Sequence, residues 1–209
     1  MERTTIEQAK LLFGSNFIGS DELKPLFERM GFLFSSIQMP EIQYSLDDLK
    51  KYSKDYILIL GISELEGTKL SIANFRECFG MNSAISEPCF YNQDWYMNEE
   101  FIHDSLQLRW YLLRKNVIES SRAVQPTELL KEHINFPTAI LCVYTFFAYY
   151  YAKKEILWHH DFIWCNDTDH NGDRIYVGKY HDVDGVNKNG FSIQRHLALR
   201  KCYAAIKQI

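Results

Sequence analysis

The sequence is poor in the residues that mark fibrous or low-complexity proteins. Only 10 of its 209 residues are glycine and 5 are proline, so neither a collagen-like nor a disordered stretch is expected. Basic residues are also a minority, because 23 Lys and Arg stand against 27 Asp and Glu, a net charge of −4. Such a chain lacks the positive field that attracts nucleic acid. A protein or small-molecule partner is therefore expected before nucleic acid, although the partner's identity stays open.

The cysteines form neither a disulfide framework nor a zinc motif. They are odd in number, widely spaced and without a CxxC pair, at Cys78, Cys89, Cys142, Cys165 and Cys202. Free, buried thiols are the expectation. The first residues show no signal-peptide pattern, which predicts a cytoplasmic location.

Common nucleotide-binding and membrane-spanning patterns are missing too. The apolar run at residues 56–62 reads as a buried strand, but neither GxGxxG nor GxxxxGK[ST] follows it. The most apolar segment, residues 138–152, has 15 residues, whereas a membrane span needs about 20. We expect a buried helix at about 138–153 and no membrane partner. No cofactor is expected apart from a divalent metal, considered below.

Aromatic residues are abundant, at 15% of the chain, and many of them lie near the C-terminus. Asn171-Gly172 predicts a type I′ turn that pairs His170 with Asp173. The flanking segments are rich in aromatic and β-branched residues, as strands are. The pattern predicts a β-hairpin at about 162–180, followed by a third strand over residues 191–197.

Short helices are expected elsewhere. Thr4 and Ser20 are predicted to cap two of them near the N-terminus, and Ser45 a third. Alternating apolar residues predict a strand over 106–114, Pro126 the start of a short helix, and helical spacing a last helix over 199–206. The predicted fold class is α+β, a mostly antiparallel sheet whose hairpin packs on the 138–153 helix. One domain, 1–209, is expected, with residues 1–54 as an optional helical subdomain.

Residues 167–173 match the first seven positions of a calcium-binding EF-hand loop, including its glycine. The match then fails, because Arg174 replaces the expected apolar residue and Gly178 stands where a bidentate Glu should close the site. The flanks also read as strands instead of helices. A tight hairpin turn is the simpler interpretation, because such turns use Asp, Asn and Gly.

A looser site remains in the His- and Asp-rich segment 159–184. His and Asp together suit zinc, manganese or iron. The candidate metal ligands are Asp167, Asp169, His170 and His181. The candidate catalytic residues are His160, Asp161, His170 and Arg195. The His side chains would act as bases or ligands, and Arg195 as an anion clamp. His159 and His160 would face opposite sides of a regular strand, so they are not expected to share one ion.

Three classes of function remain open. The favoured one is a non-catalytic binding or protein-interaction module that uses aromatic residues and Asn/Asp turns for recognition. The alternative is a hydrolase that uses the His/Asp cluster of 159–184 with or without a divalent metal. For such chemistry a second aromatic-polar cluster offers the carboxylates Asp94, Glu99 and Glu100 as half of an acid/base pair, although solvated cap and surface roles are commoner for such residues. A thiol enzyme built on Cys165 is disfavoured, because its strand context predicts a buried sulfur.

Overall fold

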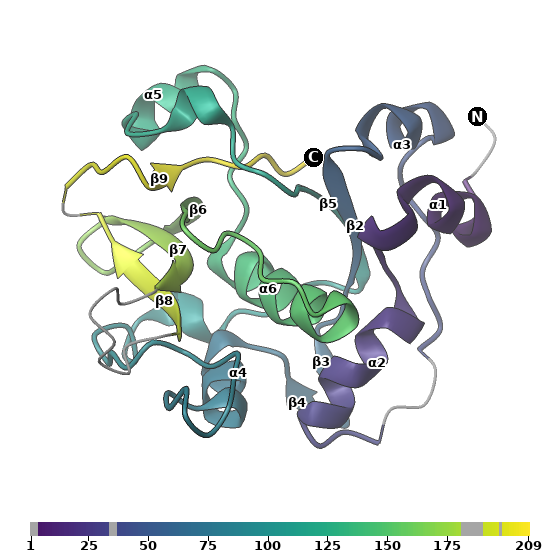
Figure 1. Cartoon of the computed structure of the whole chain (residues 1–209), viewed down its shortest axis with the longest axis horizontal. Coiled ribbons are helices and arrows are strands. Elements are labelled where there is room, and N and C mark those ends of the chain that lie inside the picture. Colours follow the sequence, from purple (N-terminus) through teal and green to yellow (C-terminus); the bar gives the residue numbers. More distant parts are fainter. Residues whose placement is uncertain (1–3, 34–36, 181–189, 197) are drawn as a thin grey trace.

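The computed structural model describes residues 4–33, 37–180, 190–196 and 198–209. Within these residues the fold combines six α-helices with three small sheets, which confirms the α+β class (Figure 1). The helices are α1 Ile6–Phe13, α2 Ser20–Arg29, α3 Leu46–Tyr52, α4 Ile72–Phe79, α5 Pro126–Lys131 and α6 Ala139–Lys153, with 3₁₀ turns η1 Gly14–Asn16, η2 Glu100–His103 and η3 Glu119–Ser121.

The strands form one mainly antiparallel four-stranded sheet, one three-stranded sheet and a small hairpin. Their orders are β8-β7-β6-β9, β1-β2-β5 and β3-β4. The bounds are β1 Phe17–Ile18, β2 Tyr56–Gly61, β3 Glu64–Leu65, β4 Thr68–Lys69, β5 Arg109–Arg114, β6 Phe162–Thr168, β7 Arg174–Tyr180, β8 Gly190–Arg195 and β9 Tyr203–Ala204. The β1–β2 and β6–β9 pairs are parallel, and the others are antiparallel.

Helix α6 lies between the two larger sheets and contacts β1, β6 and β7 (Figure 1). Every residue from Ala139 to Tyr149 is buried, which confirms the helix expected at 138–153. The hydroxyl of Tyr144 donates to the Leu60 carbonyl at 3.0 Å, so this buried polar group is satisfied. The helix begins after Thr138, whose side chain accepts from the Leu141 amide at 3.3 Å.

A cluster of phenylalanines joins α6 to α4 and β8. The Phe147 ring stacks on Phe79 at 4.3 Å and on Phe90 at 5.3 Å between centroids, and Phe191 of β8 lies 4.6 Å from Phe146. Such ring pairs add to the free energy gained by burying their area. The continuous apolar core runs from the N-terminal helices, at Ala9, to the C-terminal segment.

The hairpin forms at β6 and β7 as predicted, but its turn differs from the prediction. Only Gly172 has a positive φ (85°) in the turn, and its amide donates to the Asp169 carbonyl at 2.9 Å. The last paired residues are Thr168 and Arg174, so His170 does not pair with Asp173. A loop with one left-handed glycine after a tight turn replaces the type I′ turn, which needs two positive φ values.

The helix predicted over 199–206 is wrong. Tyr203 and Ala204 form β9, in parallel register with Phe162 and Ile163, and Ala205 bridges to Ile118. Residues 203–206 are all buried in succession. A strand covered on both faces buries consecutive residues, whereas a surface helix buries one face.

Three boundaries also shift. The α1 cap is Thr5 instead of Thr4, and the N-cap of α2 is Gly19 instead of Ser20. Ser45 caps α3 as predicted. Strand β5 starts at Arg109, because Leu108 before it is 48% exposed. The third strand of the hairpin sheet forms as β8, while Leu197 lies outside the described residues. No helix in the described part of the chain is long and apolar enough to cross a bilayer.

Candidate functional site

The tip of the β6–β7 hairpin brings two predicted site residues together with a third. Ligand atoms of Glu99, Asp169 and His170 all lie within 4.8 Å of one another. Glu99, just before η2, is only 6% exposed. One of its oxygens lies 2.6 Å from His170 Nδ1, and the other accepts from the His170 amide at 2.9 Å.

Asp169 organises the turn itself. Its Oδ1 accepts from the Asn171 and Asp173 amides at 2.9 and 2.8 Å, and Arg195 Nη1 donates to its Oδ2 at 3.3 Å. Burial acts to raise the pKa of Asp169, but these hydrogen bonds and the Arg195 cation outweigh burial and lower it. Arg195 therefore binds a carboxylate of its own chain instead of standing free as the expected anion clamp.

The pair of Glu99 and His170 has the geometry of a carboxylate that orients an imidazole. The side chain of His170 is 67% exposed, and its outer nitrogen, Nε2, lies 3.0 Å from the Asn171 side-chain amide. This arrangement can hold a proton on the inner nitrogen and offer the outer one to a solvent-side partner. Together with Asp169, it can also offer three ligand atoms to a cation.

Asp167 does not take part in this cluster. Its Oδ2 accepts from the Ala139 amide at 2.6 Å, at the N-terminus of α6. Burial raises the pKa of Asp167 even though that amide acts to lower it. Asp167 therefore serves as a helix cap. Of the four metal candidates, Asp169 and His170 meet, Asp167 does not join them, and His181 lies outside the described residues.

The other predicted catalytic residues, His160 and Asp161, lie just before β6. His159 and His160 occupy a turn, not a strand, and contact each other with ring nitrogens 3.0 Å apart. The argument from strand alternation therefore does not apply to these two residues, because they lie in a turn. Asp161 binds Arg122, with 2.5 Å between Oδ1 and Nη1.

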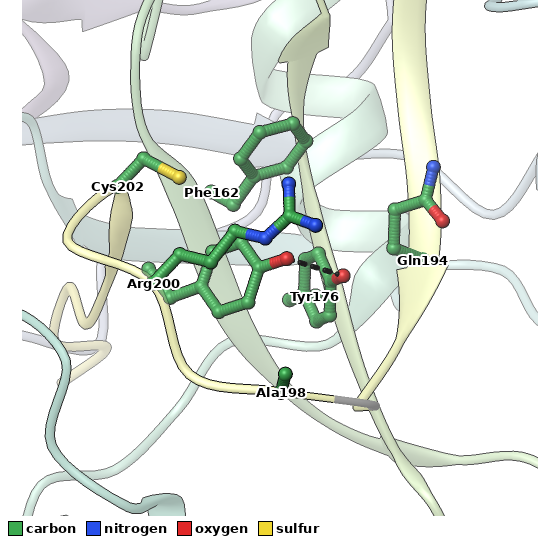
Figure 2. A pocket seen from close by; sticks show the side chains of 7 residues that line it. Phe162, Tyr176, Gln194, Ala198, Arg200 and Cys202 are labelled. Atoms are coloured by element: carbon green, nitrogen blue, oxygen red, sulfur yellow. Dashed lines mark hydrogen bonds between the residues drawn. The ribbon is translucent and has the colours of Figure 1, made fainter.

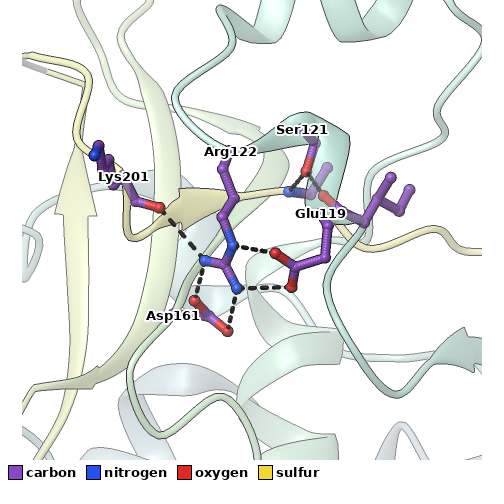
Figure 3. Close-up of polar contacts among 7 residues, drawn as sticks. Glu119, Ser121, Arg122, Asp161 and Lys201 are labelled. Carbon is purple, nitrogen blue, oxygen red and sulfur yellow. Dashed lines mark hydrogen bonds and ion pairs between the residues drawn. The ribbon is translucent and has the colours of Figure 1, made fainter.

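Arg122 is the centre of this second polar group (Figure 3). It contacts Glu119 through Nε and Nη2 at 2.7 and 3.0 Å, contacts Asp161, and reaches the Lys201 carbonyl at 3.4 Å. Both carboxylates raise the pKa of Arg122, with Glu119 first. The network joins η3, the start of β6 and the turn before β9. Nearby, the Ser121 hydroxyl accepts from the Ala205 amide at 2.7 Å.

That turn carries part of a pocket of about 220 Å³ on the four-stranded sheet (Figure 2). The lining residues are Phe162, Tyr176, Gln194, Ala198, Arg200, Cys202 and Tyr203. The hydroxyls of Tyr176 and Tyr203 lie 2.8 Å apart, and each of these side chains is 5% exposed. We call this hollow the aromatic pocket.

The charge state of the aromatic pocket follows from burial. Burial, followed by the bond to Tyr203, raises the pKa of Tyr176, so this phenol stays protonated near neutral pH. Burial likewise raises the pKa of the Cys202 thiol.

Cys165, outside the aromatic pocket, is fully buried, as the sequence predicted, and burial raises its pKa well above the ordinary value. Both thiols are therefore poor nucleophiles.

Sequence reasoning missed Arg122 and most of the aromatic pocket. Arg200 and Tyr203 were placed on a helix, where they could not have lined one wall together with Phe162. Glu99 was noticed, but nothing in its own segment indicated His170 as its partner, 71 residues away. The sequence signals that did succeed were local, namely the Asp169, His170 and Gly172 of the turn.

Comparisons of the chain with protein-family models, with curated proteins and with solved structures found no match. Function is therefore inferred from the geometry and chemistry of these sites.

Replacing Asp169 by Asn should destabilise the protein by about 2 kcal/mol at neutral pH, because an amide is a weaker acceptor and does not pair with Arg195. The lowered folded-state pKa means that the stabilisation exists above the ordinary value of 3.8 and is lost as pH falls through the folded pKa. Urea unfolding of both proteins at neutral and acidic pH measures this difference in unfolding free energy. In acid, the wild type should be no more stable than the Asn variant. The control is Asp47→Asn, because Asp47 is 94% exposed; an equal loss there would contradict the assignment.

Replacing Asp167 by Asn should stabilise the protein at neutral pH, whereas the Asp169→Asn change destabilises it. Because burial raises the folded-state pKa, this group favours the fold at low pH, and that contribution is lost as pH rises through the folded pKa. Asparagine still accepts from Ala139 but carries no charge. The variant should unfold at higher urea than wild type at neutral pH, and the difference should vanish in acid. Asp167→Ala, which removes the cap, should cost about 1 kcal/mol. A less stable Asn variant at neutral pH would refute this.

Proposed function

We propose that the protein is a non-catalytic binding module and that the aromatic pocket is the place where it binds a small ligand. The observation that supports this most directly is the composition of the pocket. Three aromatic rings surround a few polar groups, namely the two tyrosine hydroxyls, the Gln194 amide and the Arg200 guanidinium. Apolar walls with a small number of placed polar groups are typical of small-molecule sites.

The size of the aromatic pocket limits the ligand. Its volume of about 220 Å³ lies below the range of roughly 300–1,000 Å³ that is usual for drug-sized ligands. A compound of one or two rings is therefore the expected occupant. The edge-to-face contacts of Phe162 with Tyr176 and Tyr203, at 5.6 and 5.8 Å, present ring edges and faces suited to a planar partner.

The chemistry of the hairpin tip favours binding over hydrolysis. Within the described residues, His170 Nε2 has the Asn171 side-chain amide as its hydrogen-bond partner, and it forms no hydrogen bond with a Ser, Thr or Cys. A nucleophilic mechanism needs such a group within hydrogen-bond reach of the base. The hydrolase alternative would therefore require a metal-bound water.

A second candidate function, divalent-cation binding at the hairpin tip, is supported by the convergence of Glu99, Asp169 and His170 within 4.8 Å. Two carboxylates and one imidazole suit zinc, manganese or iron. An incoming ion would have to replace the contact between Arg195 and Asp169, which opposes tight binding.

Titration calorimetry with Zn²⁺ tests this second candidate. One ion per chain should bind, and His170→Ala should weaken binding at least about tenfold because one of three ligands is lost. The matched control is His103→Ala, because His103 is exposed and lies on η2 beside Glu99. Heat of binding that is absent, or equal in both variants, would end the metal proposal and leave the aromatic pocket untouched.

The main proposal is tested by filling the aromatic pocket. Ala198 is exposed and lines the pocket, so Ala198→Trp should place an indole in the space of the ligand. Saturation-transfer NMR with benzoate, phenyl phosphate, benzamide and indole should show binding to wild type and its loss in this variant. Lys201→Trp, three residues along the same turn and outside the pocket lining, is the control. Failure of all four probes, or binding that survives in Ala198→Trp, would contradict the proposal.

A further inference from the structure

We infer that the ligand of the aromatic pocket is a planar aromatic anion, whose carboxylate or phosphate is held by Arg200 and the hydroxyl pair of Tyr176 and Tyr203. This inference rests on the proposed binding function. It adds the chemical class of the ligand, which the shape of the pocket by itself leaves open.

The first support is the charge of Arg200. Arg76, Arg122 and Arg195 each pair with a carboxylate of this chain, at Asp94, at Glu119 and Asp161, and at Asp169. Within the described residues, the Arg200 side chain forms no hydrogen bond or ion pair. Its guanidinium extends across the mouth of the aromatic pocket toward the tyrosine hydroxyls (Figure 2). A planar guanidinium matches carboxylate and phosphate oxygens with two parallel hydrogen bonds.

The second support is independent of charge and comes from counting protons. Two phenolic hydroxyls carry two protons, and the single bond between Tyr176 and Tyr203 uses only one of them. Both side chains are 95% buried and line the aromatic pocket. Within the described residues, neither hydroxyl has another hydrogen-bond partner. This second proton points to no acceptor in the described part of the chain, and a ligand oxygen placed against the pair would accept it.

The third support is the way the turn is held in place. The Arg200 carbonyl accepts from the Tyr203 amide at 2.9 Å, and the Cys202 carbonyl accepts from the Phe162 amide at 2.8 Å. Arg122 binds the Lys201 carbonyl between them, while Glu119 and Asp161 fix the Arg122 guanidinium. The backbone that carries Arg200 is thus fixed against the sheet before any ligand arrives. Such preorganisation lowers the entropic cost of binding.

The aromatic part of the ligand is specified by the walls. The Tyr176 and Tyr203 rings lie 4.3 Å apart at 34°, and Phe162 stands nearly perpendicular to both. A flat ring can pack against Phe162 while its acidic substituent reaches Arg200. An inorganic anion would use Arg200 and the hydroxyls but leave these walls without contact.

The test compares matched probes on the full chain. Benzoate and phenyl phosphate carry the inferred anion, and benzamide is the neutral counterpart of benzoate. In titrations followed by amide chemical shifts, at least one anion should bind about tenfold or more tightly than benzamide, as expected for a charge-assisted pair. Acetate and inorganic phosphate, which lack the ring, should bind at least about tenfold more weakly than the matching aromatic anion.

Variants at Arg200, Tyr176 and Tyr203 test whether these side chains cause the preference for the anion over benzamide. Arg200→Gln should remove it by weakening anion binding about tenfold or more while leaving benzamide unchanged. The double variant Tyr176→Phe, Tyr203→Phe keeps the rings and should also reduce the preference for the anion. Lys201→Gln removes a neighbouring exposed charge and should keep the preference. Arg200 and Lys201 are exposed, so both single variants are expected to fold, which circular dichroism checks.

The outcomes separate the two proposals. Selective binding of phenyl phosphate or of benzoate supports the inference in either case and decides which oxyanion is preferred. If neither benzoate nor phenyl phosphate binds more tightly than benzamide, the inference is overturned but the binding pocket stands. If the preferred aromatic anion binds no more tightly than its ring-free counterpart (acetate for benzoate, inorganic phosphate for phenyl phosphate), the aromatic part of the inference is overturned. Binding by none of the probes overturns the proposed function itself.

Discussion

The burial of α6 between two sheets is the constraint on which the rest of the structure depends. A helix that is apolar on nearly all sides must be covered on nearly all sides, and its polar groups must find partners inside the protein. The Tyr144 hydroxyl meets the Leu60 carbonyl of β2, and the N-terminus of α6 meets Thr138 and Asp167. The phenylalanine cluster closes the space between α6, α4 and β8. The four-stranded sheet packs against this helix through β6 and β7.

The four-stranded sheet consequently has two different faces. Ile163 and Val177 turn toward the core that contains α6, while Phe162 and Tyr176 turn outward. The outer face belongs to a smaller apolar cluster with Leu129 and Phe136 near α5. Because that cluster covers the face only in part, the aromatic pocket remains open beside it. The apolar inner face stabilises the fold, and aromatic residues of the outer face line the aromatic pocket.

Several charged side chains of this protein pair with one another and hold turns in place, whereas Arg200 has no such partner in the described part of the chain. At the hairpin tip, Arg195 and the turn amides satisfy Asp169, and His170 meets Glu99, so these groups hold the turn against η2. Arg122 between Glu119 and Asp161 holds the turn before β9 in the same way. Arg200, on that turn, is not neutralised by a described side chain. The proposed ligand site rests on this cation and on the neighbouring hydroxyl pair of Tyr176 and Tyr203.

By itself the sequence determined the elements that depend on near neighbours: the buried helix from its apolar run, the hairpin strands from β-branched and aromatic residues, and a turn at Gly172 from its need for positive φ. It also indicated that Asp169 and His170 stand together, since they are adjacent. The tertiary structure alone decided the strand identity of residues 203–204, the partnership of Glu99 with His170, and the assembly of the aromatic pocket from Phe162, Tyr176 and the turn at Arg200. The apolar spacing at 199–206 favours a helix locally. Parallel pairing with β6 and burial on both sides instead make residues 203–204 a strand. Such pairings join residues distant along the chain, and their free energy comes from burial against surfaces that exist only once the rest has folded.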